Sequence, residues 1–226
     1  MIGVVIPTLD EADTLPLLLD DLRRVAVPLD VVVADGGSTD RTLAVAARGG
    51  ARAVAASRGR GSQMNAGARA AGGDWLLFLH ADTRLPAPAR RALLDAVVNQ
   101  PALEAAVFRF GIDLPPGWKR FIEVGQRVRQ ALYGLPYGDQ GLLVRRELFV
   151  RAGAFPEIPL LEDVALLRAL RRRARVHDLP AAIVTSGRRY VRYGVLRTWL
   201  RHSGVIALYL AGVAPRRLAR WAGRDG

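Results

Sequence analysis

The stretch Leu76-Leu77-Phe78-Leu79-His80-Ala81-Asp82-Thr83 gives the clearest indication of architecture, because an apolar run ends in it at two polar side chains. A short apolar run of this kind is typical of a buried parallel strand that leads into a loop. In open α/β sheets, ligands bind at the carboxyl ends of such strands. His80 and Asp82 lie two residues apart, so their side chains point to the same side of an extended chain. We therefore expect both side chains to face one ligand.

Asp82 has the chemistry of a cation ligand. A hard dication such as Mg²⁺ takes one or two protein carboxylates together with oxygens of a phosphorylated substrate. A carboxylate that a rigid strand delivers to the ligand-binding edge of a sheet suits that role. The sequence leaves a structural alternative open, in which Asp82 only caps a helix that begins near residues 86–89.

The length of 226 residues favours one large domain, or one domain with a small appendage, and we expect a boundary between residues 1–194 and residues 195–226. The sequence contains no cysteine, so disulfides and thiolate metal sites are excluded. Residues 1–7 lack a charged region before their apolar run, which predicts a first strand and not a signal peptide. The late apolar stretch 204–214 is too short to span a bilayer, so we expect a cytoplasmic protein.

The formal net charge of +12 is large and comes almost entirely from arginine, since Lys119 is the only lysine. Such a charge favours an anionic partner: a nucleic acid, the phosphates of a nucleotide, or an anionic membrane surface. A nucleic acid is not expected, because modules that bind one usually interleave basic and aromatic residues on one face. In this sequence the aromatic residues are few and the acidic residues stand at the ends of predicted strands.

Strands and helices alternate over the first half of the chain, which indicates a parallel α/β sheet. Strands are expected at residues 2–6, 31–34, 51–56 and 75–79, with helices at 14–25, up to 48, up to 71 and at 88–98. The second half is less regular, with strands expected at 104–113, 142–144 and 183–185 and helices at 118–132 and from 162. The predicted fold class is a single α/β domain: a mostly parallel central sheet, flanked by helices, with a helical C-terminal extension.

The first two predicted strands end in groups that can bind a ligand. Thr8 and Glu11 supply hydrogen-bonding groups after the first strand, and Asp35 stands beside two glycines that let the backbone approach a ligand closely. The dinucleotide-binding fingerprint is absent after the first strand. Turn and cap roles fit equally well, including an Asx turn at Asp35 that leads to a helix cap at Ser38 or Thr39.

Two basic loops follow later strands. Arg58 and Arg60 alternate with glycines and are able to clamp phosphate oxygens, with a solvated basic loop as the alternative. Arg188 and Arg189 follow the predicted strand at 183–185. Their positive charges would stabilise a diphosphate leaving group.

Two acidic motifs stand in the second half. Asp139 and Gln140 lie in a turn flanked by glycines and are able to contact a sugar or an acceptor hydroxyl. Glu162 and Asp163 begin a predicted helix. There they either interact favourably with the positive end of the helix dipole or provide a general base. Adjacent helical side chains diverge by about 100°, so only one of the two acids is expected to face the site.

Residues 195–226 combine arginines with aromatic and aliphatic side chains. A basic amphipathic segment of this kind suits an anionic membrane surface, so peripheral attachment at the inner face of the cell membrane is one interpretation. A helix packed on the domain has the same pattern.

The order of these motifs resembles that of the family 2 glycosyltransferases, which have the glycosyltransferase-A fold. The motifs are Pro7-Thr8 with Glu11, Asp35-Gly36-Gly37-Ser38-Thr39-Asp40, His80-Ala81-Asp82 and Glu162-Asp163. The resemblance covers essentially the whole chain and is closest to a small bacterial subgroup associated with radical-SAM and selenodomain proteins. The motifs similar to that subgroup are Arg58-Gly59-Arg60, Gln63-Met64-Asn65-Ala66-Gly67, Leu79-His80-Ala81-Asp82-Thr83, Gly138-Asp139-Gln140 and Ser186-Gly187-Arg188-Arg189.

The resemblance implies metal-dependent, inverting transfer of a sugar from a nucleotide-diphosphate sugar to an acceptor hydroxyl, with lipids and small molecules among the candidate acceptors. Residues 1–194 would be the catalytic domain. The resemblance implies that Asp82 binds Mg²⁺ or Mn²⁺, and that Asp163, beside Glu162, is the general base. The residues implied to bind the nucleotide sugar are Pro7, Thr8, Leu9, Glu11, Asp35, Gly36, Arg58, Gln63, Asn65, His80, Ala81, Asp82, Arg188 and Arg189. Asp139 and Gln140 would contact the acceptor.

The chain departs from the family pattern at two positions. His80 replaces the first acid of the usual Asp-x-Asp metal motif, which in relatives commonly contacts the ribose or the sugar, and Asp10-Glu11 replaces the usual Asn-Glu. The change at His80 keeps a non-catalytic sugar-nucleotide binder as an alternative. A nucleotidyltransferase is a further alternative, because it would share the α/β sheet, the metal and the phosphate-binding arginines.

Overall fold

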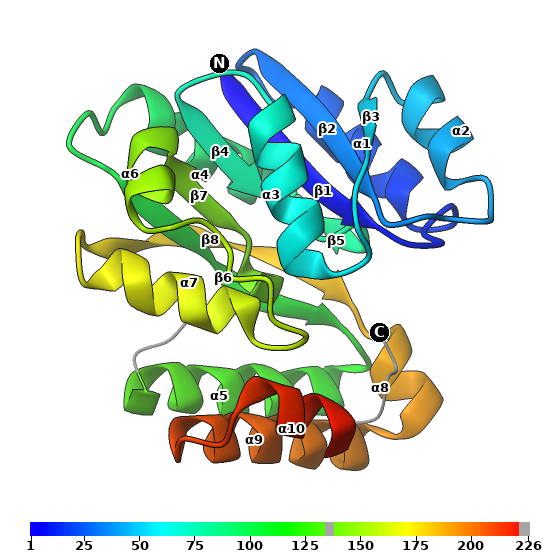
Figure 1. The fold of residues 1–226 in the computed structure, drawn as a ribbon, viewed down its shortest axis with the longest axis vertical. Coiled ribbons are helices and arrows are strands. Elements are labelled where there is room, and N and C mark those ends of the chain that lie inside the picture. The colour runs from blue at the N-terminus through cyan, green and yellow to red at the C-terminus, as the bar shows by residue number, and fades with distance from the viewer. Residues whose placement is uncertain (134–137, 222–226) are drawn as a thin grey trace.

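The predicted alternation of strands and helices is present in a computed structural model, which describes residues 1–133 and 138–221 (Figure 1). Residues 222–226 of the predicted C-terminal segment lie outside that description. The strands are β1 Ile2–Thr8, β2 Leu29–Asp35, β3 Arg52–Ala55, β4 Trp75–Phe78, β5 Thr83–Arg84, β6 Ala105–Asp113, β7 Leu142–Arg145 and β8 Val176–Ser186. The helices are α1 Leu15–Arg23, α2 Thr42–Arg48, α3 Arg60–Ala70, α4 Ala87–Val98, α5 Pro116–Tyr133, α6 Arg146–Arg151, α7 Glu162–Arg171, α8 Arg188–Tyr193, α9 Val195–Leu210 and α10 Pro215–Trp221, with a 3₁₀ turn η1 at Gly138–Gln140.

The strands form one mixed sheet in the order β3-β2-β1-β4-β7-β6-β8-β5. The pairs β1–β2, β1–β4, β2–β3 and β6–β8 are parallel, whereas β4–β7, β6–β7 and β5–β8 are antiparallel. Parallel pairs therefore predominate, which confirms the predicted fold class. The strand β7 runs antiparallel between β4 and β6, and it joins the βαβ half of the sheet to the less regular half.

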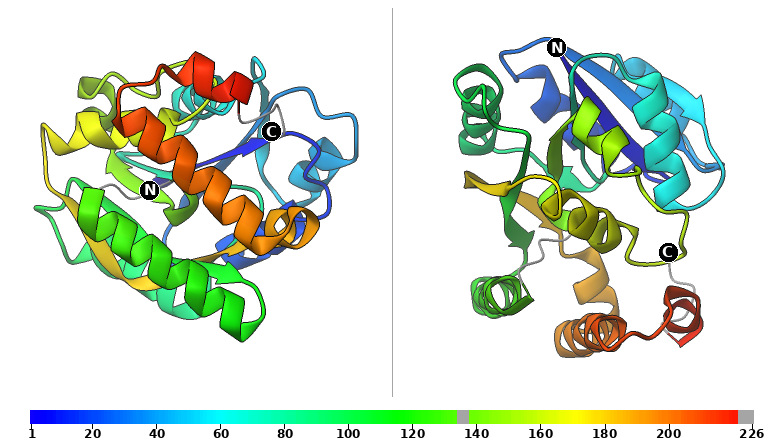
Figure 2. Two further views of the ribbon diagram at one scale, coloured as in Figure 1. Left: turned by 90° about the horizontal axis from the view of Figure 1, so that it is seen from below. Right: turned by 60° about the vertical axis from the view of Figure 1, so that its left-hand side comes forward.

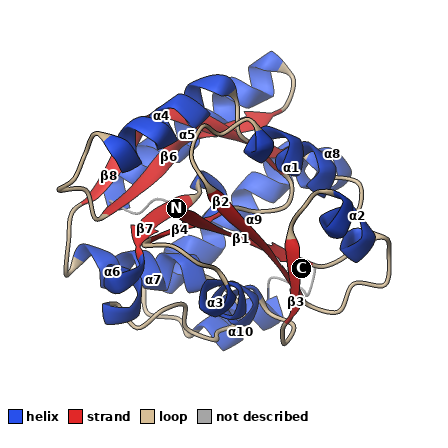
Figure 3. Ribbon diagram, turned by 90° about the horizontal axis from the view of Figure 1, so that it is seen from above, coloured by secondary structure: helices blue, strands red, loops and turns tan. Residues whose placement is uncertain are grey.

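Helices cover both faces of the sheet, as the apolar character of its strands requires. Alternate residues of β1 point to opposite faces, so Ile2, Val4 and Ile6 pack with α1 and α4 whereas Val5 packs with α3. Figure 3 shows α4 and α1 on one side of the sheet and α3, α6 and α7 on the other. The two apolar layers fix the strands, and with them the loops at the strand ends.

The helices α5, α9 and α10 form a separate layer at one end of the molecule (Figure 2). Val205, Ile206 and Leu218 of α9 and α10 are buried against Leu161 and Val164 at the start of α7. The opposite face of α9 is exposed, so the segment has one packed side and one open side. No helix in the described part of the chain combines the length and the apolar character that crossing a bilayer would need.

Candidate functional site

The candidate site lies where β1, β2 and β4 end at a common edge of the sheet. Thr8, the last residue of β1, donates a hydrogen bond of 3.0 Å from its hydroxyl to Oδ1 of Asp35, the last residue of β2. The next strand, β4, is in register with β1 and delivers His80 and Asp82 to the same edge. The sequence-based expectation that these strand ends meet is therefore confirmed.

Asp35 organises the loop that follows β2. Its carboxylate accepts hydrogen bonds from the Thr8 hydroxyl, the Ser38 hydroxyl and the backbone N–H groups of Gly37 and Ser38. Burial opposes ionisation, but these hydrogen bonds outweigh it and hold the pKa of Asp35 below its usual value. The Asx-turn interpretation is confirmed, whereas a helix cap at Ser38 or Thr39 is wrong because α2 begins only at Thr42.

Two amides predicted to bind the donor join distant segments in this structure. The Gln63 amide donates to the backbone oxygens of Thr8 (2.7 Å) and Ala34 (3.0 Å). A residue with a side chain at position 36 would bring its Cβ to 3.0 Å from the Gln63 amide nitrogen, so this close approach suits Gly36. The Asn65 amide donates to the backbone oxygen of Phe155 (2.8 Å) and accepts from its N–H (3.0 Å). Both side chains are buried, and their contact with a donor stays a prediction.

The remaining predicted donor contacts differ in accessibility. Pro7 and Leu9 are half-buried beside the site, and Arg58 and Arg189 are exposed. Ala81 is 3% exposed and belongs to the apolar core, so only its backbone is available to a ligand.

Asp82 lies in an acidic environment. Burial raises the pKa of its carboxyl, as do Asp139 and Glu11, while His80 and Arg188 act in the opposite direction. The Arg188 guanidinium lies 3.7 Å from Asp82 Oδ2. The capping alternative is wrong, because α4 begins at Ala87 and no side chain caps it. The Asp82 carboxylate is therefore stabilised by any cation that enters the site.

The residues around Asp82 fit a dication that is shared with a substrate. Within residues 1–133 and 138–221, no three His, Asp or Glu side chains converge as a complete metal site. A Mg²⁺ or Mn²⁺ ion bound to Asp82 would complete its shell with water and phosphate oxygens, an arrangement usual for Mg²⁺. The raised pKa of Asp82 is a physical reason for such an ion to bind there.

Arg188, at the start of α8, connects the C-terminal half of the chain to the end of β1. Its guanidinium lies 2.6 Å from Glu11 Oε1, and Glu11 Oε2 accepts a hydrogen bond of 2.7 Å from the Thr14 hydroxyl. The hydrogen bond with Glu11 raises the pKa of Arg188, which keeps a fixed positive charge beside Asp82. The predicted positive charge after β8 is thus located at the site.

Glu162 and Asp163 diverge as their helical positions predict. The preceding residue, Leu161, has a left-handed backbone (φ 65°), which turns the chain sharply into α7. Glu162 is 2% exposed and lies 2.9 Å from Nε of Arg60. Burial, and then Asp163, raises the pKa of Glu162, although Arg60 opposes the shift. Asp163 instead lines a pocket with His80.

Arg60 stands among the acidic groups of the site. Partial burial disfavours its charge, with 41% of the side chain still exposed, but the carboxylates of Glu162, Asp163, Asp139 and Asp82 together hold its pKa above the ordinary value. Sequence reasoning noted Arg60 as a phosphate clamp and missed its pairing with Glu162, because no local pattern links two residues so far apart in the chain.

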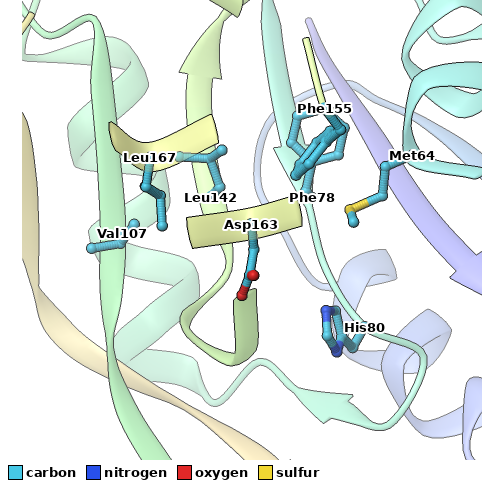
Figure 4. A pocket seen from close by; sticks show the side chains of 8 residues that line it. All are labelled: Met64, Phe78, His80, Val107, Leu142, Phe155, Asp163 and Leu167. Carbon is cyan, nitrogen blue, oxygen red and sulfur yellow. The ribbon is translucent and has the colours of Figure 1, made fainter. Parts of the chain in front are cut away.

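A small pocket lies beside Asp163 and His80. Figure 4 shows the Asp163 carboxylate extending from α7 into this pocket, toward the side on which His80 lies. The rest of the lining is apolar: Met64, Phe78, Val107, Leu142, Phe155 and Leu167. Sequence reasoning missed these residues as part of a site, because apolar residues on strands and helices are typical of a core.

The two predicted acceptor residues occupy different environments. Asp139 is exposed, and its carboxylate lies 3.6 Å from Nδ1 of His80. Gln140 is 1% exposed, and its amide donates to the backbone oxygen of Phe108 (3.0 Å) and accepts from Gln126 of α5 (3.3 Å). The structure therefore brings Asp139 to the site and places the Gln140 side chain in the packing between β6 and α5.

Comparison with known proteins gives matches at the level of sequence and of fold. The model of the family named Glycosyl transferase family 2 matches residues 3–147. A segment of 93 residues is 40% identical to a PGL/p-HBAD biosynthesis glycosyltransferase of Mycobacterium tuberculosis, and it covers 38% of this chain and 36% of that protein. The match thus spans just over a third of the length of that curated relative.

Solved structures share the fold at low sequence identity. TarS 1-349 of S. aureus in complex with UDP-GlcNAc is 20% identical, with a TM-score of 0.62 over 82% of this chain and 58% of that chain. The mannosyltransferase PcManGT from Pyrobaculum calidifontis in complex with GDP-Man and Mn²⁺ is 24% identical, with a TM-score of 0.61 over 82% and 56%. These likenesses confirm the predicted glycosyltransferase-A fold.

Proposed function

We propose, from the premise that this chain belongs to glycosyl transferase family 2, that it transfers a sugar from a nucleotide-diphosphate sugar to an acceptor hydroxyl. One observation carries the proposal. Two aspartates, Asp82 in the loop after β4 and Asp163 at the start of α7, lie close enough to one guanidinium, that of Arg60, to raise its pKa. A candidate cation ligand and a candidate base therefore lie near the same guanidinium.

The donor is proposed from the neighbours and from the loop chemistry. Solved neighbours hold UDP-GlcNAc in one case and GDP-Man with Mn²⁺ in another. In this chain, Pro7, Thr8, Leu9 and the loop after Asp35 form the edge on which the nucleoside would lie. Arg188 would place its positive charge beside the diphosphate, as would the exposed Arg58 and Arg189.

The metal is proposed on the chemistry of Asp82. A bound Mg²⁺ or Mn²⁺ would supply positive charge that stabilises the diphosphate as it leaves. Asp82 would hold that ion together with the phosphate oxygens, and Arg188 would add a second, permanent positive charge at 3.7 Å from the same carboxylate. His80, which replaces an acid of the family pattern, would be held in place by Asp139.

Asp163 is proposed as the general base. Its carboxylate would accept the proton of the acceptor hydroxyl while that oxygen forms a bond to the anomeric carbon, and the bond from this carbon to the diphosphate oxygen breaks. Attack from the side opposite the leaving group inverts the anomeric configuration. Glu162, which pairs with Arg60 at 2.9 Å, would position that guanidinium near the base.

The finer assignments are also proposals. Asp139 is the exposed acid that would contact an acceptor, and lipids and small molecules remain the candidate acceptors. Membership of the subgroup associated with radical-SAM and selenodomain proteins is supported by the quoted motifs. A cytoplasmic location stays a prediction.

A panel of nucleotide sugars, with and without Mn²⁺ or Mg²⁺, tests the proposal by thermal shift. A ligand at about 100 times its Kd stabilises a protein by about 2.7 kcal/mol, which raises the Tm of a chain of this size by about 5–11 °C. We expect one family of donors to do so only with metal, with chelator as the control. Stabilisation by nucleoside triphosphates and by no nucleotide sugar would instead favour the nucleotidyltransferase alternative.

A further inference from the structure

The C-terminal part of the sequence is rich in arginine and poor in acidic residues. Between Asp178 and Asp225 the sequence has nine arginines and no Asp, Glu or Lys, so this segment accounts for nine of the twelve net positive charges. Eight of the nine lie on the helices α8, α9 and α10. Five of these eight lie on α9 and α10, in the layer of helices at one end of the molecule, and three lie on α8, where Arg188 pairs with Glu11 at the candidate site.

The helix α9 presents an exposed apolar stripe on this layer. Leu196, Leu200 and Leu208 are 51%, 55% and 40% exposed, and their spacing places them along one side of the helix. Val205 and Ile206, on the other side, are buried against the start of α7. The exposed leucines are thus outside the core that α9 already shares with the rest of the domain.

The helix α5 extends the same exposed apolar surface. Trp118, Val124 and Val128 are 46%, 42% and 53% exposed. The ring of Phe121 lies 5.1 Å from that of Trp199, which joins α5 to α9. Seen from below in Figure 2, the two helices lie side by side across the end of the molecule. The exposed apolar residues of both helices, flanked by arginines, form what we call the basal face.

We infer that the basal face docks on an anionic membrane surface. Amphipathic helices with a basic polar side and exposed leucine and tryptophan lie in the boundary between headgroups and acyl chains. The arginines attract anionic lipid phosphates, and the leucines supply apolar area that enters the bilayer. A nucleic acid would use the arginines but would leave the exposed aliphatic side chains in water, so a lipid surface accounts for both features.

Docking at this face would place the candidate site beside the bilayer. The helices α9 and α10 contact Leu161 and Val164, the residues on either side of the acid pair, through Val205 and Leu218. If the proposed transfer is correct, its acceptor is then a lipid that carries a hydroxyl near the headgroup level. This last step rests on the proposed function, whereas the docking itself does not.

Vesicle co-sedimentation of the full chain, without donor or metal, tests the docking. The vesicles are phosphatidylcholine alone and phosphatidylcholine mixed with phosphatidylglycerol, at low and high salt. One variant, Leu196→Gln with Leu200→Gln, removes apolar area, and another, Arg216→Gln with Arg217→Gln, removes charge. Matched controls on other surfaces are Leu43→Gln on α2 and Arg91→Gln on α4, both exposed positions.

We expect the anionic vesicles to retain the protein and neutral vesicles to retain much less. The double arginine variant should partition about 30-fold more weakly and the double leucine variant about tenfold more weakly, while both controls behave as wild type. Equal retention of the protein by neutral and anionic vesicles would overturn the inference. Binding of the double leucine variant to anionic vesicles as strongly as wild type would overturn it too, because the basal face would then bind polyanions without using its apolar residues. Donor binding is scored separately by thermal shift, so failure of either proposal is distinguishable.

Discussion

The ion pair between Arg60 and Glu162 offers the sharpest structural test, because its two members differ so much in exposure. Glu162 is 2% exposed, whereas 41% of the Arg60 side chain is open to solvent, and the two charges meet at 2.9 Å. Replacement of Arg60 by Met keeps much of the aliphatic side chain and removes the charge. The buried Glu162 carboxylate then loses its counter-ion.

The expected loss of stability follows from burial. Removal of one partner from a fully buried pair costs about 3–5 kcal/mol. Because the Arg60 side chain is partly open to water, its attraction for the Glu162 carboxylate is weaker than in a fully buried pair. We therefore expect Arg60→Met to lower the free energy of unfolding by about 2–3 kcal/mol. For a chain of this length each kcal/mol corresponds to about 2–4 °C in Tm, so Arg60→Met should melt about 4–12 °C lower.

The loss should also depend on pH. Burial already raises the pKa of Glu162 above its ordinary 4.5, and it should rise further without Arg60. When a carboxyl has a higher pKa in the folded protein than in the unfolded chain, it costs no stability at a pH where it is protonated in both states. It destabilises the folded protein increasingly as the pH rises through its pKa in the folded state. Thermal or urea unfolding should therefore separate Arg60→Met from wild type more at about pH 8 than at about pH 5.

A double-mutant cycle decides whether the pair is responsible. Glu162→Gln in the Arg60→Met background should recover much of the lost stability, because the unpaired charge is gone. Arg58→Met, at an exposed neighbouring position, is the control and should change little. An Arg60→Met protein that melts with wild type at both pH values would refute the reasoning.

Three further substitutions have defined outcomes. Asp82→Asn should abolish the metal-dependent part of donor stabilisation without lowering Tm, since burial already disfavours that charge; donor titration by thermal shift with and without chelator checks this. Asn65→Leu leaves both backbone groups of Phe155 without their partner and should cost about 2–3 kcal/mol by urea unfolding, unlike the exposed control Asn99→Leu. Leu218→Ala should cost about 2–5 kcal/mol in one cooperative transition; a separate transition for the C-terminal helices would contradict their packing on α7.

The positions of the strands and their edge chemistry could be predicted because the signals are local. The apolar runs of β1, β2 and β4 and the polar residues after them are contiguous in sequence, and the parallel pairing of such strands brings their ends together. The short strand β5 was not predicted, because its two residues pair with β8 from far along the chain. The helix α6 was also missed, because it follows β7 directly.

The roles of the polar side chains were harder to predict than their positions. Gln63, Asn65 and Gln140 look like ligand-binding amides in the sequence, yet in the structure they pair with backbone groups of distant segments. A buried amide must find such partners, but only the tertiary structure shows which ones. The pairing of Arg60 with Glu162 was hidden for the same reason.

The most direct test of the proposed transfer compares wild type with Asp163→Asn once a donor and an acceptor have been identified. The rate of nucleoside diphosphate release is measured at saturating donor, and donor affinity is measured separately by thermal shift. The proposed base predicts that Asp163→Asn turns over about 10²–10⁴-fold more slowly, while donor affinity stays near that of wild type and Glu162→Gln loses less. An Asp163→Asn enzyme with near wild-type turnover would contradict the mechanism.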